Sequence, residues 1–110
     1  MCGIAGITSL GDIAGRLVKC IHNLEYRGYD SCGIAMINGA REVHVSKNVG
    51  SVAEVSDRER FSSLSGKTGI AHTRWATHGA VTKENSHPHS SCGKDFSITH
   101  NGIISNHQAL

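Results

Sequence analysis

The chain has 110 residues, of which 38% are hydrophobic and 18% charged, with 13 Gly and one Pro, which fits one small globular domain and excludes collagen-like or disordered sequence. The net charge of +2 comes from scattered Lys and Arg residues, so no basic stripe indicates nucleic-acid binding. No apolar run approaches the roughly 20 residues of a membrane helix, and no signal peptide begins the chain, so we expect a cytoplasmic protein without a membrane partner.

The first elements are a strand and an amphipathic helix. Residues 3–9 are almost wholly apolar, which is typical of a strand buried on both faces. Residues 13–24 then place apolar side chains at helical spacing. Asp12 is a suitable N-cap for this helix, and Gly28 lies where it should stop.

The middle of the chain predicts a hairpin, a second helix and a third strand. Residues 33–37 and 42–47 are strand-like runs around Asn38-Gly39, a pair whose members both tolerate positive φ in a hairpin turn. A weaker helix covers residues 52–64. The apolar run "GIAHT" at 69–73 follows as another buried strand.

The last third of the chain has little periodicity. Residues 74–95 are polar and rich in breakers, and a loop of this length in a small domain is usually functional or disordered. Residues 96–100 predict a strand, and 106–110 predict the first turn of a helix. Because the chain ends as this helix begins, we expect residues 1–110 to be a piece of a longer domain.

The four cysteines do not indicate a disulfide framework. An even count has that meaning in small secreted chains, but no export signal is present here, so we expect reduced thiols. No C-x-x-C pair, the usual mark of structural zinc, occurs either. The chain also has eight His, most of them in its second half.

Cys2 follows the initiator Met1 directly, so removal of Met1 would leave it at the N-terminus. A thiol is a strong nucleophile only as thiolate, and its proton therefore needs an acceptor. An N-terminal residue carries one itself, an α-amine with a pKa of roughly 7.7–8.0. Taken alone, however, Cys2 is better explained as an ordinary buried thiol at the start of a strand.

Polar segments elsewhere favour the catalytic reading. They are "CGI" at the N-terminus, then "EYRGYDS", "HTRWATHG", "HPH" and "HNGII". In this order they resemble the class II glutamine amidotransferase domain, and the resemblance runs from residue 2 to the last residue. Among class II members the chain is most similar to those that supply ammonia for conversion of fructose 6-phosphate to glucosamine 6-phosphate.

The resemblance implies an α+β fold, the four-layer αββα sandwich of the N-terminal-nucleophile (Ntn) hydrolases. Residues 1–110 would supply only the N-terminal portion of this glutaminase domain. The remainder of the domain and the sugar-isomerase domains are absent from the chain.

The resemblance also implies roles for individual residues. Cys2 attacks the side-chain amide of glutamine, and the Asn101 side chain and Gly102 N–H stabilise the oxyanion that forms. Arg74 binds the α-carboxylate of glutamine, as suits a planar guanidinium. Trp75, Thr77 and His78 would line or gate the glutamine pocket. Arg27, His87 and His89 would support the site and its lid.

The partners implied are glutamine and, through the absent isomerase domain, fructose 6-phosphate. We expect no metal and no organic cofactor, and a homo-oligomer for the complete enzyme. The family binds the α-ammonium group of glutamine with an aspartate downstream of "HNGII", beyond the end of this chain. Residues 1–110 alone are therefore expected to hydrolyse glutamine weakly or not at all.

Three alternatives remain at this point. One is another class II enzyme such as amidophosphoribosyltransferase, whose counterparts of "EYRGYDS" and "HTRWATHG" read differently. The second is a non-catalytic interaction domain. The third is a metal-binding module, although its ligands would fit no common zinc spacing; they would be His72, His78, His87, His89 and Cys92.

Overall fold

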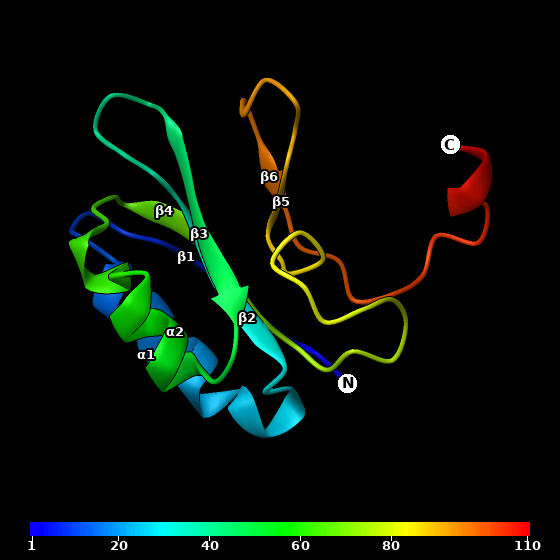
Figure 1. Ribbon diagram of the computed structural model, residues 1–110. Coiled ribbons are helices and arrows are strands. Elements are labelled where there is room, and N and C mark those ends of the chain that lie inside the picture. The colour runs from blue at the N-terminus through cyan, green and yellow to red at the C-terminus, as the bar shows by residue number, and fades with distance from the viewer.

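Four antiparallel strands form the centre of the computed structural model, which describes residues 1–110 (Figure 1). Their order in the sheet is β1-β4-β2-β3, so β4 and β2 are central while β1 and β3 are edges. All neighbours pair antiparallel. The strands span Gly3–Thr8 (β1), Ser31–Ile37 (β2), Val43–Val49 (β3) and Thr68–Arg74 (β4).

The predicted burial of the first strand is wrong, although the strand itself is confirmed. Only Gly3 in β1 is buried, and the Ile4 side chain is 43% exposed. β1 has a single neighbour, β4, and only the helix-facing side of the sheet is covered around it. An apolar run shows that a strand can be buried, but it does not reveal an edge position.

Two helices cover one face of the sheet (Figure 1): α1 spans Ala14–Asn23 and α2 spans Val52–Arg58. The core lies between them and the sheet, and the predicted apolar face of α1 supplies much of it. The turn Glu25–Arg27 (η1) carries the chain from α1 to Gly28. The fully buried members from α1 and its N-cap are Ile13, Leu17 and Ile21.

Asp12 was predicted to be the N-cap of α1, but it is the residue before the N-cap. The N-cap residue is Ile13. The Asp12 carboxylate nevertheless accepts hydrogen bonds from the N–H of Ala14 at 3.0 Å and of Gly66 at 3.1 Å. It therefore satisfies a free donor of the helix and also ties the helix start to the turn before β4.

The second predicted helix is shorter than residues 52–64. It ends where Arg60 adopts a left-handed conformation (φ 51°), and a short turn, Phe61–Ser63 (η2), follows. This break buries Phe61 completely against the core. A helix continuing through residue 60 would direct Phe61 elsewhere, so burial of one aromatic ring stabilises the break.

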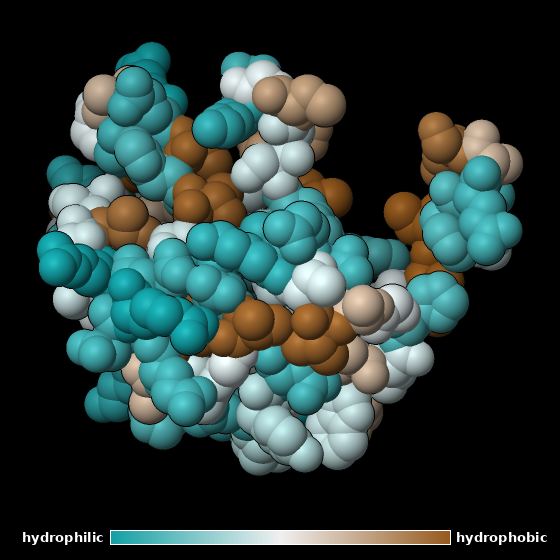
Figure 2. Space-filling view, in the orientation of Figure 1, coloured by the Kyte–Doolittle hydropathy of each residue, from teal (hydrophilic) through white to brown (hydrophobic).

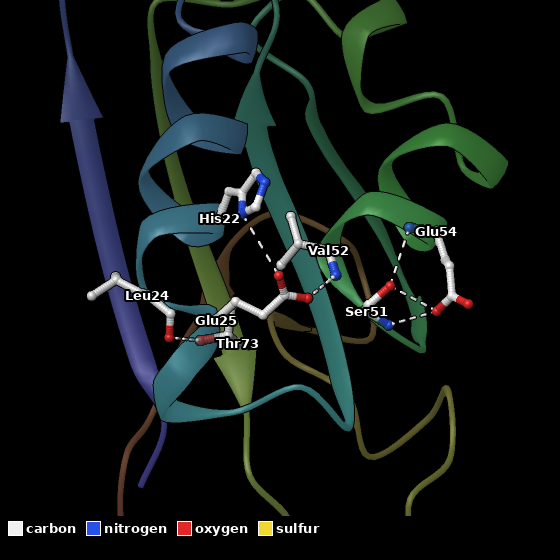
Figure 3. A network of polar contacts seen from close by, with 7 residues as sticks. All are labelled: His22, Leu24, Glu25, Ser51, Val52, Glu54 and Thr73. Carbon is white, nitrogen blue, oxygen red and sulfur yellow. Dashed lines mark hydrogen bonds and ion pairs between the residues drawn. The ribbon is translucent and has the colours of Figure 1, made fainter.

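Polar contacts join α1, η1 and the start of α2 near the end of β4 (Figure 3). The Glu25 carboxylate accepts the Val52 N–H at 2.7 Å, and its other oxygen lies 3.6 Å from His22 Nδ1. Ser51 and Glu54 form a reciprocal capping box at the first turn of α2. The Thr73 hydroxyl donates to the Leu24 carbonyl at 3.4 Å, which fixes η1 beside the end of β4.

The predicted hairpin is confirmed, but its turn differs from the expected one. Strands β2 and β3 pair, and the Asn38 N–H donates to the Glu42 carbonyl at 3.0 Å. The positive φ falls on Arg41 (63°) and not on Asn38-Gly39. The Asn38 side-chain oxygen instead accepts the N–H groups of Ala40 and Glu42, at 2.9 Å each. This Asx-type arrangement stabilises the longer turn.

The last third of the chain lies on the side of the sheet away from the helices (Figure 1). Two short strands, His89–Ser90 (β5) and Ser97–Ile98 (β6), pair there, so the strand predicted at 96–100 is only two residues long. The expected helix at the end is a short turn, His107–Ala109 (η3). No helix has the length and apolar character needed to cross a membrane.

Candidate active site

The N-terminus of β1 and the C-terminal end of β4 lie side by side. Gly3 pairs with Thr73, so antiparallel register brings Cys2 beside Arg74 and Trp75. The Trp75 backbone N–H donates to Cys2 Sγ at 3.3 Å, and the thiol lies 3.6 Å from the Trp75 carbonyl oxygen. A donor aimed at sulfur is a suitable partner for a thiolate.

Packing of the "RGYD" segment fixes the chain after β4. An added Cβ on Gly28 would lie 2.4 Å from the Arg74 carbonyl carbon and 2.5 Å from the Trp75 nitrogen, so only glycine allows this approach. Asp30 accepts the Ala76 N–H on its carboxylate at 2.8 Å, while its own N–H donates to the Arg74 carbonyl at 3.1 Å. The segment thus holds the backbone that contacts the Cys2 sulfur.

Arg27 does not line the cleft. Its guanidinium lies 3.6 Å from Met1 Sδ and stacks at 6.0 Å from the Tyr26 ring centroid. Arg27 therefore lies beside Met1 and outside the cleft.

The Arg74 guanidinium is buried and turned toward the loop that follows it. It donates to the His78 carbonyl at 2.6 Å and to the Ala80 carbonyl at 2.9 Å, and the residue is only 8% exposed. Arginine has five N–H donors in a planar fork, so these two bonds leave donors for a ligand. Arg74 both shapes the loop and faces the cleft.

Asn101 comes from the far end of the chain to contact the thiol residue. Its Nδ2 donates to the Cys2 carbonyl at 3.0 Å, and its Oδ1 lies 2.8 Å from His72 Nε2. The N–H of Gly102 donates to no oxygen within the chain. The Asn101 amide nitrogen therefore contacts the Cys2 backbone, and Gly102, whose N–H has no partner in the chain, lines the same cleft as Cys2.

The imidazole rings of His72, His87 and His89 pack against each other next to Asn101. The His72 and His87 rings stack at 4.4 Å between centroids, and His87 meets His89 edge-on at 4.3 Å. Burial lowers the pKa of His72 to about 4, against the opposing effect of its bond to Asn101. Burial and then the charge of His72 lower the pKa of His87 to about 3, and burial also lowers that of His89. All three rings are neutral at pH 7.

A cleft of about 1070 Å³ lies beside these groups; Asn101 and His72 are not among its lining residues. Figure 2 shows a hollow between the protruding C-terminal segment and the rest of the molecule. Among the residues predicted from the sequence, those that line the cleft are Cys2, Arg74, Trp75, Thr77, His78, His87, His89 and Gly102.

Several lining residues were not predicted. They come mostly from the segment around "THNGII", in which the sequence predicted site roles only for Asn101 and Gly102. Its apolar members expose side chains that an isolated globular chain normally covers. The unpredicted lining residues are Gly79, Asn85, Ile98, Thr99, His100, Ile103, Ile104 and His107.

The histidines and cysteines do not assemble into a metal centre. No three His, Cys, Asp or Glu side chains are arranged to hold a metal ion. His72 and His87 meet through their ring faces, and Cys92 is exposed at the tip between β5 and β6. All four cysteines are free thiols, as expected.

The chain was compared with known proteins. No protein-family model matches it. Over all 110 residues it is 50% identical to the glutamine–fructose-6-phosphate aminotransferase (isomerizing) of Methanococcus maripaludis and 48% identical to that of Haemophilus influenzae. In both cases it spans 18% of the relative's length.

Solved structures with the same fold are also amidotransferases. The glutamine phosphoribosylpyrophosphate amidotransferase from B. subtilis superposes on 83% of this chain with a TM-score of 0.69 and 27% identity, over 19% of that structure. A structure described as the allosteric regulatory enzyme of purine biosynthesis superposes on 80%, with a TM-score of 0.70, 28% identity and 18% of its own chain.

The sheet, its helical layer and the cleft around Cys2 define the class: the chain has the α+β fold of the Ntn amidotransferases. Its sequence is nearer to another branch of that class than to the two superposed structures. Over its whole length the chain is similar to part of the glutamine–fructose-6-phosphate aminotransferases.

Proposed function

We propose that residues 1–110 are the N-terminal part of a glutamine-hydrolysing domain in which Cys2 is the nucleophile. One observation carries the proposal: Cys2 lines the cleft, and the Asn101 amide nitrogen, 99 residues away in sequence, donates to the Cys2 carbonyl at 3.0 Å. A structural strand thiol needs neither a cleft nor a fixed amide donor beside it.

The proposed reaction begins with attack of Cys2 Sγ on the side-chain carbonyl carbon of glutamine. A C–S bond forms, and the carbonyl π electrons move to oxygen, giving a tetrahedral oxyanion. The α-amine of mature Cys2 accepts the thiol proton and passes it to the departing nitrogen. The C–N bond then breaks, ammonia leaves, and a glutamyl thioester remains on the sulfur.

Hydrolysis of the thioester follows the same route in reverse order. Water attacks the carbonyl carbon and gives its proton to the α-amine, and a second oxyanion forms. The C–S bond breaks, glutamate leaves, and the proton returns to sulfur. Both oxyanions would be stabilised by the Asn101 amide and the Gly102 N–H, a contribution of about 2.7–4 kcal/mol per donor in comparable sites.

Substrate binding is assigned to the wall formed after β4. The free N–H groups of Arg74 suit the α-carboxylate of glutamine, and Trp75, Thr77 and His78 line the same wall. His87 and His89 support it from below as neutral rings. The Arg74 guanidinium is already held by the His78 and Ala80 carbonyls, so its orientation is fixed before a ligand binds.

The α-amine can act only after Met1 is removed. The Met1 residue is 76% exposed, so an aminopeptidase can reach it. Cys2 is small enough to follow a cleaved Met, and its amine then becomes the nearest base to its own sulfur.

The whole protein's reaction is proposed from its relatives. Since they are 46–50% identical over the entire chain, we propose that the ammonia serves aminotransfer to fructose 6-phosphate. Residues beyond this chain would complete the glutaminase domain and supply the isomerase activity. A homo-oligomeric state and a cytosolic address remain predictions.

Labelling with an electrophilic glutamine analogue tests the nucleophile. In the complete mature protein we expect peptide mass spectrometry to find the label on Cys2 and not on Cys20, Cys32 or Cys92. Cys92 is the matched control because it is an exposed thiol outside the cleft. Equal labelling of Cys2 and Cys92, or a fully retained Met1 in active protein, would contradict the mechanism.

A second candidate concerns the acceptor, because both superposed structures belong to phosphoribosyl or purine enzymes. Glutamine-dependent product formation should be measured with fructose 6-phosphate and with phosphoribosyl pyrophosphate in parallel. We expect turnover only with fructose 6-phosphate. Turnover with the pyrophosphate alone would replace the proposed acceptor and leave the glutaminase assignment intact.

A further inference from the structure

We propose that His72 is a positioning residue for the reaction: its Nε2–H holds the Asn101 carboxamide so that the amide nitrogen faces Cys2. This inference rests on the proposed function, since it assigns the origin of one oxyanion donor. His72 is not one of the residues that line the cleft, and it makes no hydrogen bond to the Cys2 sulfur; it reaches the site through Asn101 and His87.

The first step is the dependence of Asn101 on its neighbours. Asn101 lies in an exposed segment without regular structure, and its side chain makes two hydrogen bonds, to His72 and to the Cys2 carbonyl. An asparagine in such a segment has a free χ2 rotation that could exchange its oxygen and nitrogen. Two opposed partners remove that freedom.

The second step is the direction of each bond. The Cys2 carbonyl oxygen can only accept, so the amide group facing it at 3.0 Å must be Nδ2. The remaining amide atom, Oδ1, can also only accept, so His72 Nε2 at 2.8 Å must carry a hydrogen. His72 is therefore the Nε2–H tautomer.

The third step concerns the other ring nitrogen. His72 Nδ1 is buried and has no hydrogen-bond partner. A proton there would be a buried donor without an acceptor, which is costly, whereas an unprotonated Nδ1 is compatible with the site. The neutral Nε2–H ring is thus the form that satisfies every contact.

The fourth step is the rigidity of the ring. His72 is fully buried in central strand β4, opposite Gly33 of β2, and its face stacks on His87. The His100 N–H donates to His87 Nδ1 at 3.4 Å, so the residue before Asn101 is held by the same stack. A rigid strand therefore positions a group on an exposed segment.

The consequence concerns the second hydrogen on Asn101 Nδ2. One of the two is committed to the Cys2 carbonyl, and the other is free to meet the substrate oxygen. If the amide rotated, an oxygen would face the developing oxyanion and repel it. Fixing the orientation in advance stabilises the transition state more than the bound substrate.

Paired substitutions in the complete mature protein test the inference. His72→Phe keeps the ring shape and removes the donor, and we expect glutamine turnover to fall about 10–100-fold with the KM for glutamine changed less than about twofold. His72→Gln can place an N–H near the position of Nε2, so we expect it to recover most of the turnover. In an Asn101→Ala background, His72→Phe should have little further effect.

The result that overturns the inference is equally specific. Equal damage from His72→Gln and His72→Phe, or full additivity with Asn101→Ala, would indicate a packing role only. Selective 15N-histidine labelling gives a reading independent of activity: an Nδ1–H tautomer for His72 also refutes the inference. A wild-type protein that fails to hydrolyse glutamine refutes the proposed function instead, while the tautomer still decides the orientation of Asn101.

Discussion

Gly28→Ala tests whether close backbone packing behind β4 sets the geometry at the Cys2 sulfur. The new Cβ would lie 2.4 Å from the Arg74 carbonyl carbon and 2.5 Å from the Trp75 nitrogen. Real Cβ contacts essentially never fall below 3.0 Å, so these atoms must separate by at least 0.6 Å, the difference between 3.0 and 2.4. Both neighbours are backbone atoms and cannot rotate away.

The size of the effect follows from this displacement. Gly28 has an extended backbone (φ 177°), so the penalty is steric and not conformational. Overpacking of this kind costs about 1–3 kcal/mol of folding stability. The Trp75 N–H that contacts the sulfur must move, and since a 1 Å misplacement in an active site costs roughly 10²-fold, we expect about a tenfold loss of glutamine hydrolysis.

Gly15→Ala is the matched control. An added Cβ at Gly15 meets nothing within 4 Å, and Gly15 lies within α1, where alanine is favoured by about 1 kcal/mol. Thermal unfolding and the rate of Cys2 labelling by a glutamine analogue should be measured for both variants. We expect Gly15→Ala to be neutral or stabilising; wild-type stability and labelling in Gly28→Ala would refute the argument.

Three further predictions concern the cleft. Asn101→Ala should lower kcat for glutamine about 10²–10³-fold with little change in KM, measured by steady-state kinetics, and a pure affinity loss would contradict an oxyanion role. Arg74→Ala should chiefly raise the KM for glutamine, and unchanged affinity would exclude it as the carboxylate partner. Because burial lowers the pKa of His72 to about 4 and of His87 to about 3, the unfolded chain binds more protons than the folded one below about pH 6.5. Denaturation at several pH values should therefore show full stability above pH 6.5 and a loss as pH falls toward 4, a loss that His72→Gln should reduce.

The parts of the fold that could be predicted are those that local pattern encodes. Strands β2 and β4 are central and read as continuous apolar runs, and α1 follows its helical spacing. The edge position of β1 is a property of its neighbours and has no local signal. The break at Arg60 has none either, because a non-glycine residue with positive φ is stabilised there by burial of Phe61.

The long loop after β4 could not be predicted because distant side chains hold it. Lys47 Nζ donates to the Ser86 carbonyl at 2.6 Å and to the Glu84 carbonyl at 3.3 Å, while Arg74 binds two carbonyls nearer the strand. Such bonds depend on the assembled sheet and not on residue type within the loop. A segment that appears structureless in sequence is thereby ordered by tertiary contacts.

The residues of the candidate site that could be predicted are those that belong to a recognisable sequence motif. Cys2 and Arg74 were both predicted, and both face the cleft. His72 was named only as a possible metal ligand, since it lies in an apolar strand that reads as core. Its contact is with Asn101, 29 residues later in the chain, and no local pattern shows that the fold brings the two together.

The joining of Asn101 to the Cys2 carbonyl has a consequence during synthesis. At about 5–20 residues per second, Cys2 is added to the growing chain roughly 5–20 s before Asn101, which follows 99 residues later. Once Met1 has left the ribosome, the residues that complete the cleft have still not been made, and Met1 is accessible to an aminopeptidase. The reactive end of the polypeptide can thus be matured before any pocket exists to use it.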